Sequence, residues 1–244
     1  MNSLFIDMHV HSTYSHDCDT SILAIANKLK KEKLGVSITD HNEIKGSLEL
    51  AKKHPKLLVI PGIEITSYSG KDILIYFDKF SELKEFYSRH ILPNKKYNRR
   101  TNKTNLSTSY VIDIAKDYNA LVAMPHPFMR LKGAYKEALK NEDILDNIDA
   151  IEVLNASKSK KANYKSFKWC NSINKPFVAG SDGHILSRVG SAGIEVKGET
   201  PSDVLDQIRN KKAIVFGDSD RLSVLFKELG SIVKNKLRFK KNIK

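Results

Sequence analysis

Short apolar runs alternate with amphipathic segments along almost the whole chain. Apolar runs of strand length are expected as strands at residues 4–10, 35–39, 57–60, 64–66, 73–77, 121–124, 150–154, 177–179, 193–196 and 213–216. Segments with apolar positions at helical spacing are expected as helices at residues 20–33, 44–53, 80–90, 109–118, 135–141, 161–173, 201–210 and 219–237. Because the two kinds of segment alternate, the pattern predicts an α/β fold built from βα units.

Two segments depart from simple alternation. Residues 73–77 are expected to pair with residues 64–66 as a hairpin across Ser69 and Gly70, and residues 93–107 are polar and basic, which predicts a long loop or lid. About seven βα-like units favour a closed or nearly closed, TIM-like barrel. The chain of 244 residues shows no linker or internal repeat, so we expect one domain over residues 1–244.

Histidine and acidic residues follow five of the apolar runs. The clusters are Asp7-Met8-His9-Val10-His11, Thr39-Asp40-His41-Asn42, Pro61-Gly62-Ile63-Glu64, Pro125-His126-Pro127 and Ser181-Asp182-Gly183-His184. Imidazole and carboxylate together suit divalent metals such as Zn, Mn or Fe. In a βα scaffold the strand ends meet at one mouth, so the clusters predict a multinuclear metal site there.

Local spacing assigns roles within these clusters. His9 and His11 are two positions apart on a strand, so both imidazoles face the same side and can bind one metal. Asp7 shares that face and is expected to accept a hydrogen bond from an imidazole nitrogen. Asp40 is compatible with a ligand, an orienting group or a helix cap. Pro127 is expected to hold His126 in an extended conformation.

In this order the five clusters resemble the signature of the PHP family, named for polymerase and histidinol phosphatase. That signature runs D-x-H-x-H, T-D-H, P-G-x-E, H-P and S-D-x-H, and the resemblance spans residues 7–184. It implies a distorted seven-stranded βα barrel with two or three Zn, Mn or Fe ions at its mouth. The ligand positions that the resemblance implies are His9, His11, His41, Glu64, His126, Asp182 and His184.

The chain departs from the family pattern at two positions. After the first cluster the family supplies a further ligand, and here either His16 or Asp17 stands in its place, of which we favour Asp17. The family often carries a histidine before the second strand of the hairpin, where this chain has Asp72. Asp72 is therefore a candidate oxygen ligand.

The resemblance implies a hydrolase that acts on phosphate esters through a metal-activated hydroxide at a di- or trinuclear site. Asp40 or His184 is the candidate group that protonates the leaving oxygen. Arg130 and Arg188 are the first candidates to bind the substrate phosphate because each follows a ligand cluster closely, and Arg99 and Arg100 are further candidates.

The net charge limits the classes of expected partner without selecting one of them. The 41 Lys and Arg against 28 Asp and Glu give a net charge of +13, concentrated partly in residues 95–103 and 234–244. This balance favours a small phosphorylated substrate, a nucleotide or an oligonucleotide. A phosphomonoesterase is therefore one hypothesis and a nuclease or nucleotide phosphodiesterase another. A non-catalytic nucleic-acid-binding module is a third, disfavoured because the ligand set is nearly complete.

Cysteine content and hydropathy bear on location. Cys18 and Cys170 are too few for a secreted disulfide framework, and although Cys18 stands near the first cluster, a role in packing is favoured for it. Neither a membrane-spanning apolar run nor a leader is evident, so we expect a cytoplasmic protein with no membrane partner.

Overall fold

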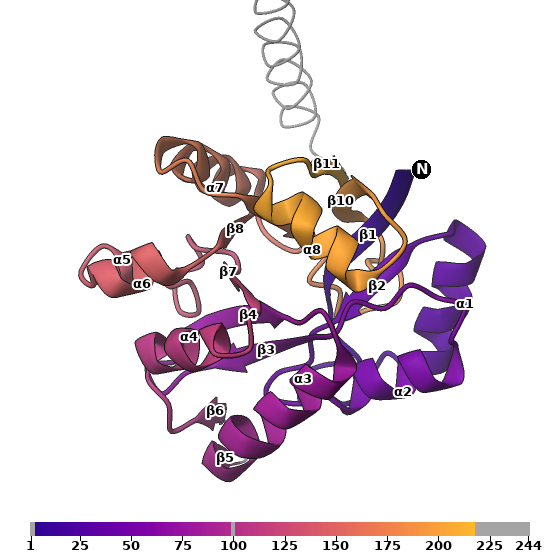
Figure 1. Cartoon of the computed structure of the whole chain (residues 1–244), viewed down its shortest axis with the longest axis horizontal. Coiled ribbons are helices and arrows are strands. Elements are labelled where there is room, and N and C mark those ends of the chain that lie inside the picture. Colours follow the sequence, from indigo (N-terminus) through magenta and orange to yellow (C-terminus); the bar gives the residue numbers. More distant parts are fainter. Residues whose placement is uncertain (1–2, 99–100, 218–244) are drawn as a thin grey trace, which may run out of the picture.

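The first sheet contains the strand that carries His9 and ends just before His11. In the computed structural model, which describes residues 3–98 and 101–217, this sheet has the order β11-β10-β1-β2. Its strands are β1 (Ser3–Val10), β2 (Gly35–Ile38), β10 (Ala192–Lys197) and β11 (Ile214–Gly217). β1 pairs parallel with β2 and antiparallel with β10, so the amino-terminal strand lies between the second strand and a strand from the carboxyl-terminal half (Figure 1).

The second sheet has five strands in the order β3-β4-β7-β8-β9. They are β3 (Gly62–Thr66), β4 (Asp72–Tyr76), β7 (Leu121–Met124), β8 (Ala150–Asn155) and β9 (Phe177–Gly180). β3 and β4 form the expected antiparallel hairpin, and β7, β8 and β9 run parallel. Their carboxyl ends therefore point the same way and carry residues 125–127, 156–159 and 181–184 to one region.

The described strands do not form one continuous seven-stranded barrel. Between the two sheets the described residues form isolated bridges in place of a continuous ladder, Val36 with Val59, His41 with Glu64 and Val10 with Gly183. Residues 57–60, expected as a strand, make only the first of these bridges, and Pro61 follows them without an N–H to continue a ladder. The fold is a mixed α/β arrangement whose sheets face a common centre.

Eight α-helices are described, and most lie against the outer faces of the sheets (Figure 1). They are α1 (Ile22–Glu32), α2 (Lys45–Lys53), α3 (Phe80–Phe86), α4 (Thr108–Lys116), α5 (Tyr135–Ala138), α6 (Glu142–Asn147), α7 (Lys160–Ser172) and α8 (Pro201–Arg209). α7 packs on β8, α8 on β10, and α4 on β4 and β7. Side-chain oxygens of Ser21, Ser107, Ser159 and Thr200 cap four helices, which explains where these helices begin.

Three expectations about helices and loops need correction. Residues 93–107 are not a plain loop, because they contain the hairpin of β5 (Lys95–Asn98) and β6 (Thr101–Thr104). Residues 80–90 are not one α-helix, because a π-helical turn over Tyr87–Ile91 follows α3. The helix expected at residues 135–141 ends at Ala138, and α6, which was not expected, begins after Asn141, whose side chain caps it. The helix expected at residues 219–237 lies outside the described residues.

The polar hairpin forms because its side chains find partners on the main body. Thr104 is buried and its hydroxyl donates to the carbonyl oxygen of Thr66 at 3.1 Å. The Lys95 ammonium lies 3.1 Å from a carboxylate oxygen of Glu43 and 3.1 Å from the hydroxyl of Tyr87. Hydrogen bonds rather than apolar periodicity therefore hold this element, and a search for apolar runs passes over it.

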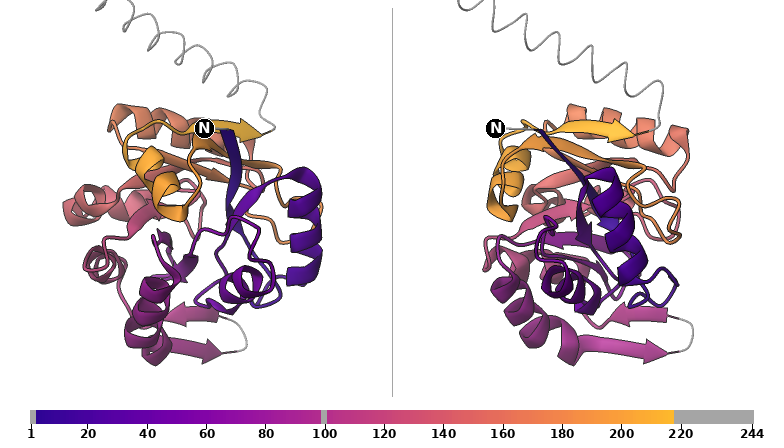
Figure 2. Two further views of the ribbon diagram at one scale, coloured as in Figure 1. Left: turned by 45° about the vertical axis from the view of Figure 1, so that its right-hand side comes forward. Right: turned by 90° about the vertical axis from the view of Figure 1, so that its right-hand side faces the viewer.

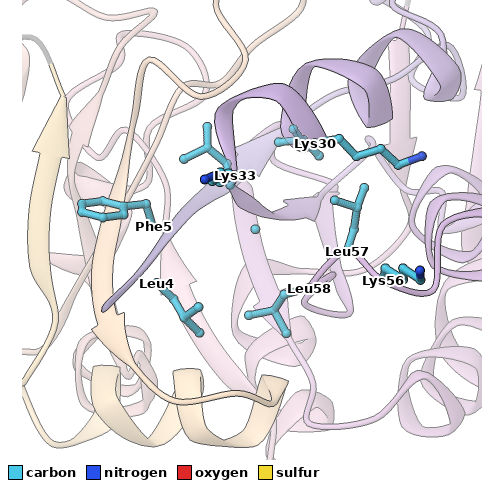
Figure 3. A pocket seen from close by; sticks show the side chains of 10 residues that line it. Leu4, Phe5, Lys30, Lys33, Lys56, Leu57 and Leu58 are labelled. Atoms are coloured by element: carbon cyan, nitrogen blue, oxygen red, sulfur yellow. The ribbon is translucent and has the colours of Figure 1, made fainter. Parts of the chain in front are cut away.

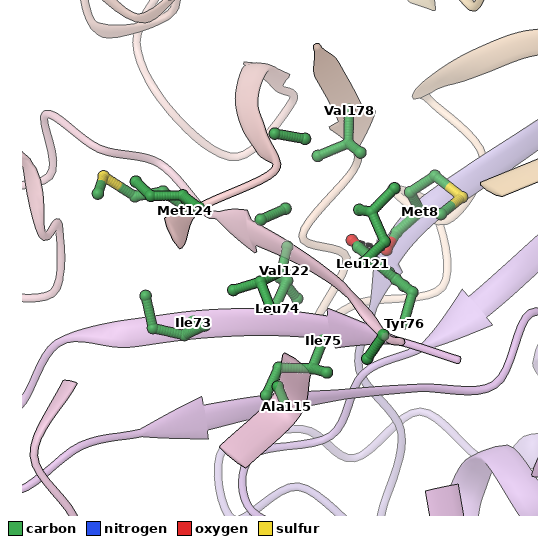
Figure 4. Close-up of a cluster of buried hydrophobic side chains, with 14 of the residues drawn as sticks. Met8, Ile73, Leu74, Ile75, Tyr76, Ala115, Leu121, Val122, Met124 and Val178 are labelled. Carbon is green, nitrogen blue, oxygen red and sulfur yellow. Dashed lines mark hydrogen bonds between the residues drawn. The ribbon is translucent and has the colours of Figure 1, made fainter. Parts of the chain in front are cut away.

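The largest apolar cluster of the described residues contains side chains from both sheets and from the helices that cover them, and Figure 4 shows part of it. Ile73 to Tyr76 of β4 pack there with Leu121 and Val122 of β7, Ala115 of α4 and Met8 of β1. Tyr76 is fully buried, and its hydroxyl donates to the carbonyl oxygen of Met8 at 2.9 Å. A buried tyrosine needs such a partner, and this hydrogen bond connects the two sheets beneath the strand ends.

A cavity of about 410 Å³ opens at the amino ends of β1 and β2 (Figure 3). Its lining includes Leu4, Phe5, Leu57, Leu58, Lys30, Lys33 and Lys56. None of these is a candidate ligand, and the cavity lies at the opposite end of β1 from His9 and His11.

No helix in the described part of the chain is long and apolar enough to span a bilayer.

Candidate metal centre

All nine candidate ligands come together at one end of the strands, where β1, β2, β7 and β9 end and β4 begins. They form four overlapping groups, in each of which the potential ligand atoms lie within 4.8 Å of one another. The groups are His11, Asp17, His41 and His184; His9, His11 and Glu64; His9, His126 and Asp182; and His41, Glu64 and Asp72. We call these nine residues the metal centre. His16 belongs to none of the groups among the described residues, whereas Asp17 belongs to the first.

Glu64 lies in the middle of this metal centre. One carboxylate oxygen, Oε2, is 3.3 Å from Nε2 of His9, 3.3 Å from Nε2 of His11 and 3.2 Å from Nδ1 of His41. The other, Oε1, is 3.3 Å from Nε2 of His126. One carboxylate thus faces imidazoles on both sides, which is the arrangement that a bridging ligand between two cations requires.

The spacing of these atoms fits a bound cation. Nε2 of His9 and Nε2 of His11 are 3.2 Å apart, and each is 3.3 Å from the same Glu64 oxygen. Ligands about 2.1 Å from a tetrahedral zinc ion lie roughly 3.4 Å from one another. The three atoms therefore already have the separations that coordination to one ion produces.

Several buried polar atoms of the metal centre have no hydrogen bond in the described part of the chain. They are Nδ1 of His11, Nδ1 of His126 and Oε1 of Glu64. A buried polar atom without a partner costs about 1–3 kcal/mol. Hydrogen bonding within the protein does not account for the arrangement, whereas a divalent cation would supply the missing partner for the carboxylate.

The charges of the metal centre shift the pKa values of its members in opposite directions. Burial alone would lower the pKa of His11, but hydrogen bonds to the Asp182 and Glu64 carboxylates raise it to about 10. The same balance, with Glu64, Asp182 and Glu152 as the anions, raises the pKa of His9 well above its usual value. For His41 burial prevails, and the pKa falls to about 3.

The pKa values of the carboxylates are shifted by burial and by the same neighbouring charges. Burial opposes ionisation of Glu64, yet the imidazoles of His41 and His9 hold its pKa well below the usual value. Asp182 follows the same pattern, because burial is outweighed by His9 and His11. In Asp72 burial and the nearby Glu64 charge prevail and raise the pKa to about 6. The ionised carboxylates of the metal centre therefore favour the positively charged form of the His9 and His11 imidazoles.

Three of the residues in the strand-end loops have left-handed backbone conformations. The φ angles are 52° at Asn42, 50° at Asp182 and 29° at His126. His126 is therefore not in the extended conformation expected before Pro127. Its N–H donates to Oε2 of Glu152 at 2.7 Å, and its carbonyl oxygen accepts from the N–H of Met129 at 2.8 Å. These two bonds hold a conformation that costs about 1–3 kcal/mol.

Glu152 of β8 orients two candidate ligands and was missed in the sequence. Its Oε1 lies 2.9 Å from Nδ1 of His9, and its Oε2 accepts from the N–H of His126. The role of holding a histidine ring was expected of Asp7, but Asp7 instead accepts backbone N–H groups of His9, Ser181 and Gly190. An acidic residue inside an apolar run was the available signal for Glu152.

Two lysines at the edge of the metal centre were also missed. The Lys158 ammonium lies 2.7 Å from Oδ2 of Asp182, and the Lys132 ammonium lies 3.3 Å from Oδ1 of Asp72. The arginines expected to bind phosphate have surroundings that differ from those of the two lysines. Arg130 is exposed, and the Arg188 guanidinium donates to the carbonyl oxygen of Ala156 at 2.6 Å. Arg99 and Arg100 lie outside the described residues.

Asp40 lies beside the metal centre and joins none of its groups within the described ranges. Its two carboxylate oxygens accept from the N–H and the hydroxyl of Ser12 at 2.6 and 2.7 Å, so it fixes the loop that follows His11. Burial raises its pKa to about 6. Cys18 is buried, and its thiol donates to the carbonyl oxygen of His184 at 3.2 Å, in keeping with a role in packing.

The fold and the metal centre together define an α/β protein with a cluster of histidine and carboxylate side chains at its strand ends. The sequence profile of the PHP domain matches residues 7–159, and a profile described as PHP-associated matches residues 160–213. The chain belongs to the PHP family. A relative from Methanocaldococcus jannaschii, described as an uncharacterized protein, is 27% identical over 207 residues, which cover 82% of this chain and 74% of that protein.

Solved structures share the fold. Endonuclease Q from Pyrococcus furiosus superposes with a TM-score of 0.70 at 21% identity, over 91% of this chain and 60% of that one. A two-domain protein from Bacteroides vulgatus, containing a predicted PHP-like metal-dependent phosphoesterase, has a TM-score of 0.64 at 16% identity, over 88% of this chain. The chain spans 65% of the length of that protein. PsfC from Pseudomonas syringae has a TM-score of 0.66 at 15% identity, over 97% of this chain and 100% of that one.

Proposed function

We propose that this protein is a metal-dependent phosphoesterase that hydrolyses phosphate esters with two or three divalent cations, Zn, Mn or Fe, held by the metal centre. The observation that carries the proposal is the convergence of nine imidazole and carboxylate side chains around Glu64. The mixture of nitrogen and oxygen ligands suits these borderline metals. Four overlapping groups that share ligands support more than one ion.

The proposed ligands divide between the strand-end loops of both halves of the chain. Asp17 and Asp72 complete the set of histidines and carboxylates that the family resemblance implies. Because residues 7–159 and 160–213 both contribute, we propose that residues 1–244 act as one unit and that the two sheets are halves of a distorted barrel. The bridges at Val36 and Val10 support this view, since they join the sheets on either side of the metal centre.

Bound cations would polarise the phosphoryl oxygens and lower the pKa of an attacking water. Side chains of the protein would bind the phosphate and supply the proton that the leaving oxygen takes up. Lys132 and Lys158, together with Arg130 and Arg188, are the proposed groups that balance negative charge on the phosphoryl oxygens. The two candidates for protonation of the leaving oxygen are His184, whose side chain is 32% exposed, and Asp40, which is fully buried and bonded to Ser12. His184 can serve only when its Nε2 holds no cation, because its Nδ1 bonds the carbonyl oxygen of Asp182.

The proposal is tested with protein purified without chelator. Its metal content should be measured, and its turnover of p-nitrophenyl phosphate, bis-p-nitrophenyl phosphate and a 5′-labelled oligonucleotide should be assayed with added Mn, Zn or Fe(II). We expect bound metal and hydrolysis of at least one ester, both lost in Glu64→Gln. Glu49→Gln is the matched control, because Glu49 bonds Tyr14 and Lys53 away from the metal centre. Folded protein that binds no transition metal and turns over no ester would refute the proposal.

A nuclease or nucleotide phosphodiesterase is the second candidate function, and the β5–β6 hairpin favours it. Nδ2 of Asn102 donates to the carbonyl oxygen of His41 at 2.9 Å, and Nδ2 of Asn42 donates to the carbonyl oxygen of Asn102 at 2.9 Å. The basic hairpin thus rests on the loop of a candidate ligand, at the opposite end of the molecule from α7 (Figure 2).

The same hairpin borders an exposed aromatic ring. Tyr68, in the β3–β4 turn, is 67% exposed, and the Lys96 ammonium lies 5.9 Å from the centre of its ring. Stacking rings beside cations are typical of surfaces that bind single-stranded nucleic acid. Preference for the diester and the oligonucleotide in the assay above would select this function. Salt-dependent oligonucleotide binding without turnover under any metal would instead select a non-catalytic binding module.

A further inference from the structure

A second cavity adjoins the metal centre. It has a volume of about 200 Å³ and lies between the segment after β7 and the first turns of α7. Its lining includes His126, Phe128, Met129, Lys158, Ala162 and Ser166. We call it the side pocket.

The side pocket and the metal centre share walls. His126 lines the pocket, while its Nε2 lies 3.3 Å from Oε1 of Glu64. Lys158 also lines the pocket, while its ammonium lies 2.7 Å from Oδ2 of Asp182. A molecule bound at the metal centre would therefore lie directly beside the side pocket, because His126 and Lys158 border both.

The walls of the side pocket are held in place by packing behind them. The Phe128 ring lies 4.3 Å from the ring of Tyr135 and 6.1 Å, edge to face, from that of Trp169. On the other wall the side chain of Asn163 exchanges two hydrogen bonds, of 3.0 and 3.2 Å, with the backbone of Asn155. Because both walls are fixed by such contacts, the pocket exists before a ligand arrives, which reduces the cost of binding.

We propose that the side pocket receives the organic group of a phosphate monoester whose phosphate lies at the metal centre, with Lys158 contacting both. The inference rests on the proposed function and narrows its substrate to monoesters with a compact, partly apolar group. Pockets for drug-sized ligands measure roughly 300–1,000 Å³, so this smaller space suits a group about the size of a phenyl ring. Phe128, Met129 and Ala162 supply apolar contact, and Ser166 adds a hydroxyl.

The reaction that this placement serves is a simple hydrolysis. The oxygen of one water forms a new bond to phosphorus, and the bond between phosphorus and the ester oxygen breaks. The organic group leaves as an alcohol or phenol after its oxygen takes one proton, and inorganic phosphate is the other product. The pocket would hold the departing group while Lys158 stays with the phosphate.

The test compares two phosphonates, which resist hydrolysis, on the metal-loaded protein by isothermal titration calorimetry. Phenylphosphonate fills the side pocket and methylphosphonate does not, so the wild type should bind the first roughly tenfold or more tightly, the ratio expected for burying much of a ring. Ala162→Leu fills the pocket and should abolish this preference while leaving the affinity for methylphosphonate unchanged. Lys161→Leu on the same helix is the control, because Lys161 is exposed and lies outside the lining.

A second variant tests the contact to phosphate. Lys158→Met should weaken both phosphonates by a similar factor, about tenfold, because it removes a cation that both would contact. Equal affinity of the wild type for the two phosphonates, or an unchanged preference in folded Ala162→Leu, would overturn the pocket assignment. Failure of metal-loaded wild type to bind either phosphonate would overturn the proposed function as well, so the two failures are distinguishable.

Discussion

Glu152 illustrates how much depends on single side chains beneath the metal centre. It lies on β8, is 1% exposed, and bonds the ring of His9 and the backbone of His126. Nδ2 of Asn155 donates to it at 2.9 Å and to Asp182 at 3.1 Å. One carboxylate thus holds the ring of His9, from β1, and the backbone of His126, in the loop after β7, without itself joining the four groups of described candidate ligands.

Glu152→Gln should weaken metal binding by about 10–100-fold, the usual effect of removing a partner that orients a ligand. The substitution removes the negative charge that supports a proton on Nδ1 of His9. Glutamine keeps one accepting oxygen, and its NH2 group cannot accept a hydrogen bond, so the contacts with Nδ1 of His9 and with the N–H of His126 cannot both persist. Competition with a chelator of known affinity measures the change, and Glu49→Gln again serves as control. Affinity equal to that of the wild type would show that His9 does not depend on this contact.

The hairpin of β5 and β6 is the element whose placement bears most directly on substrate choice. It has little apolar surface of its own and depends on Asn102, Thr104 and Lys95 for its attachment. Its partners are His41, Thr66 and Glu43, which lie on or next to the strand-end loops of the metal centre. A change in the hairpin is therefore expected to affect long substrates that reach it more than small ones.

Asn102→Ala removes the hydrogen bond to the carbonyl oxygen of His41, at a cost of about 1 kcal/mol in the free energy of unfolding. If the protein is a nuclease, KM for an oligonucleotide should rise severalfold while KM for p-nitrophenyl phosphate stays the same. Asn94→Ala is the matched control, since Asn94 bonds the carbonyl oxygen of His90 instead. An equal rise for both substrates would argue against a role of the hairpin in binding the longer one.

At the scale of the whole molecule, the metal centre joins the two sheets. Its members come from β1 and β3, from the loops after β1, β2, β7 and β9, and from the start of β4, so bound cations would connect both sheets directly. Around them, buried carboxylates and imidazoles carry opposite charges in close contact. Stability and metal binding are therefore expected to be coupled, and both to depend on pH.

Removal of metal should lower the thermal midpoint of unfolding. A ligand that binds only the folded state stabilises it by about 2.7 kcal/mol when its free concentration is 100 times Kd. We expect EDTA treatment to lower the midpoint by several degrees and Mn or Zn to restore it, as followed by circular dichroism. Glu64→Gln should respond weakly to both treatments. A midpoint that neither EDTA nor added metal changes would contradict a shared metal centre.

Metal binding should release protons and strengthen as pH rises. Without metal the pKa of His11 is raised to about 10 and that of His9 is raised well above its usual value, so both imidazoles favour the protonated form. A cation binds neutral imidazole, and these protons must leave. His41, with its pKa lowered to about 3, contributes none above pH 5. Calorimetry in buffers of different ionisation enthalpy measures the release, and an affinity that is constant from pH 6 to pH 9 would contradict it.

Much of the candidate site could be predicted because its signals are local. His9 and His11 share a strand face through a two-residue spacing, and clusters such as Thr39-Asp40-His41 directly follow apolar runs. Closure of the strands into one barrel was not predictable in the same way. It depends on pairing between strands far apart in the chain, and the described sheets meet at single bridges instead.

By itself the sequence determined the kinds of side chain, their spacing on each strand and the position of most strands along the chain, because these are properties of a few neighbouring residues. Only the tertiary structure decided which charges meet. Glu152 lies 143 residues from His9 along the chain, and Lys158 lies next to Asp182 because β8 and β9, which precede these two residues, pair in parallel. The φ of His126 and the hairpin at residues 95–104 are likewise set by distant partners, and local patterns carry no information about contacts of that kind.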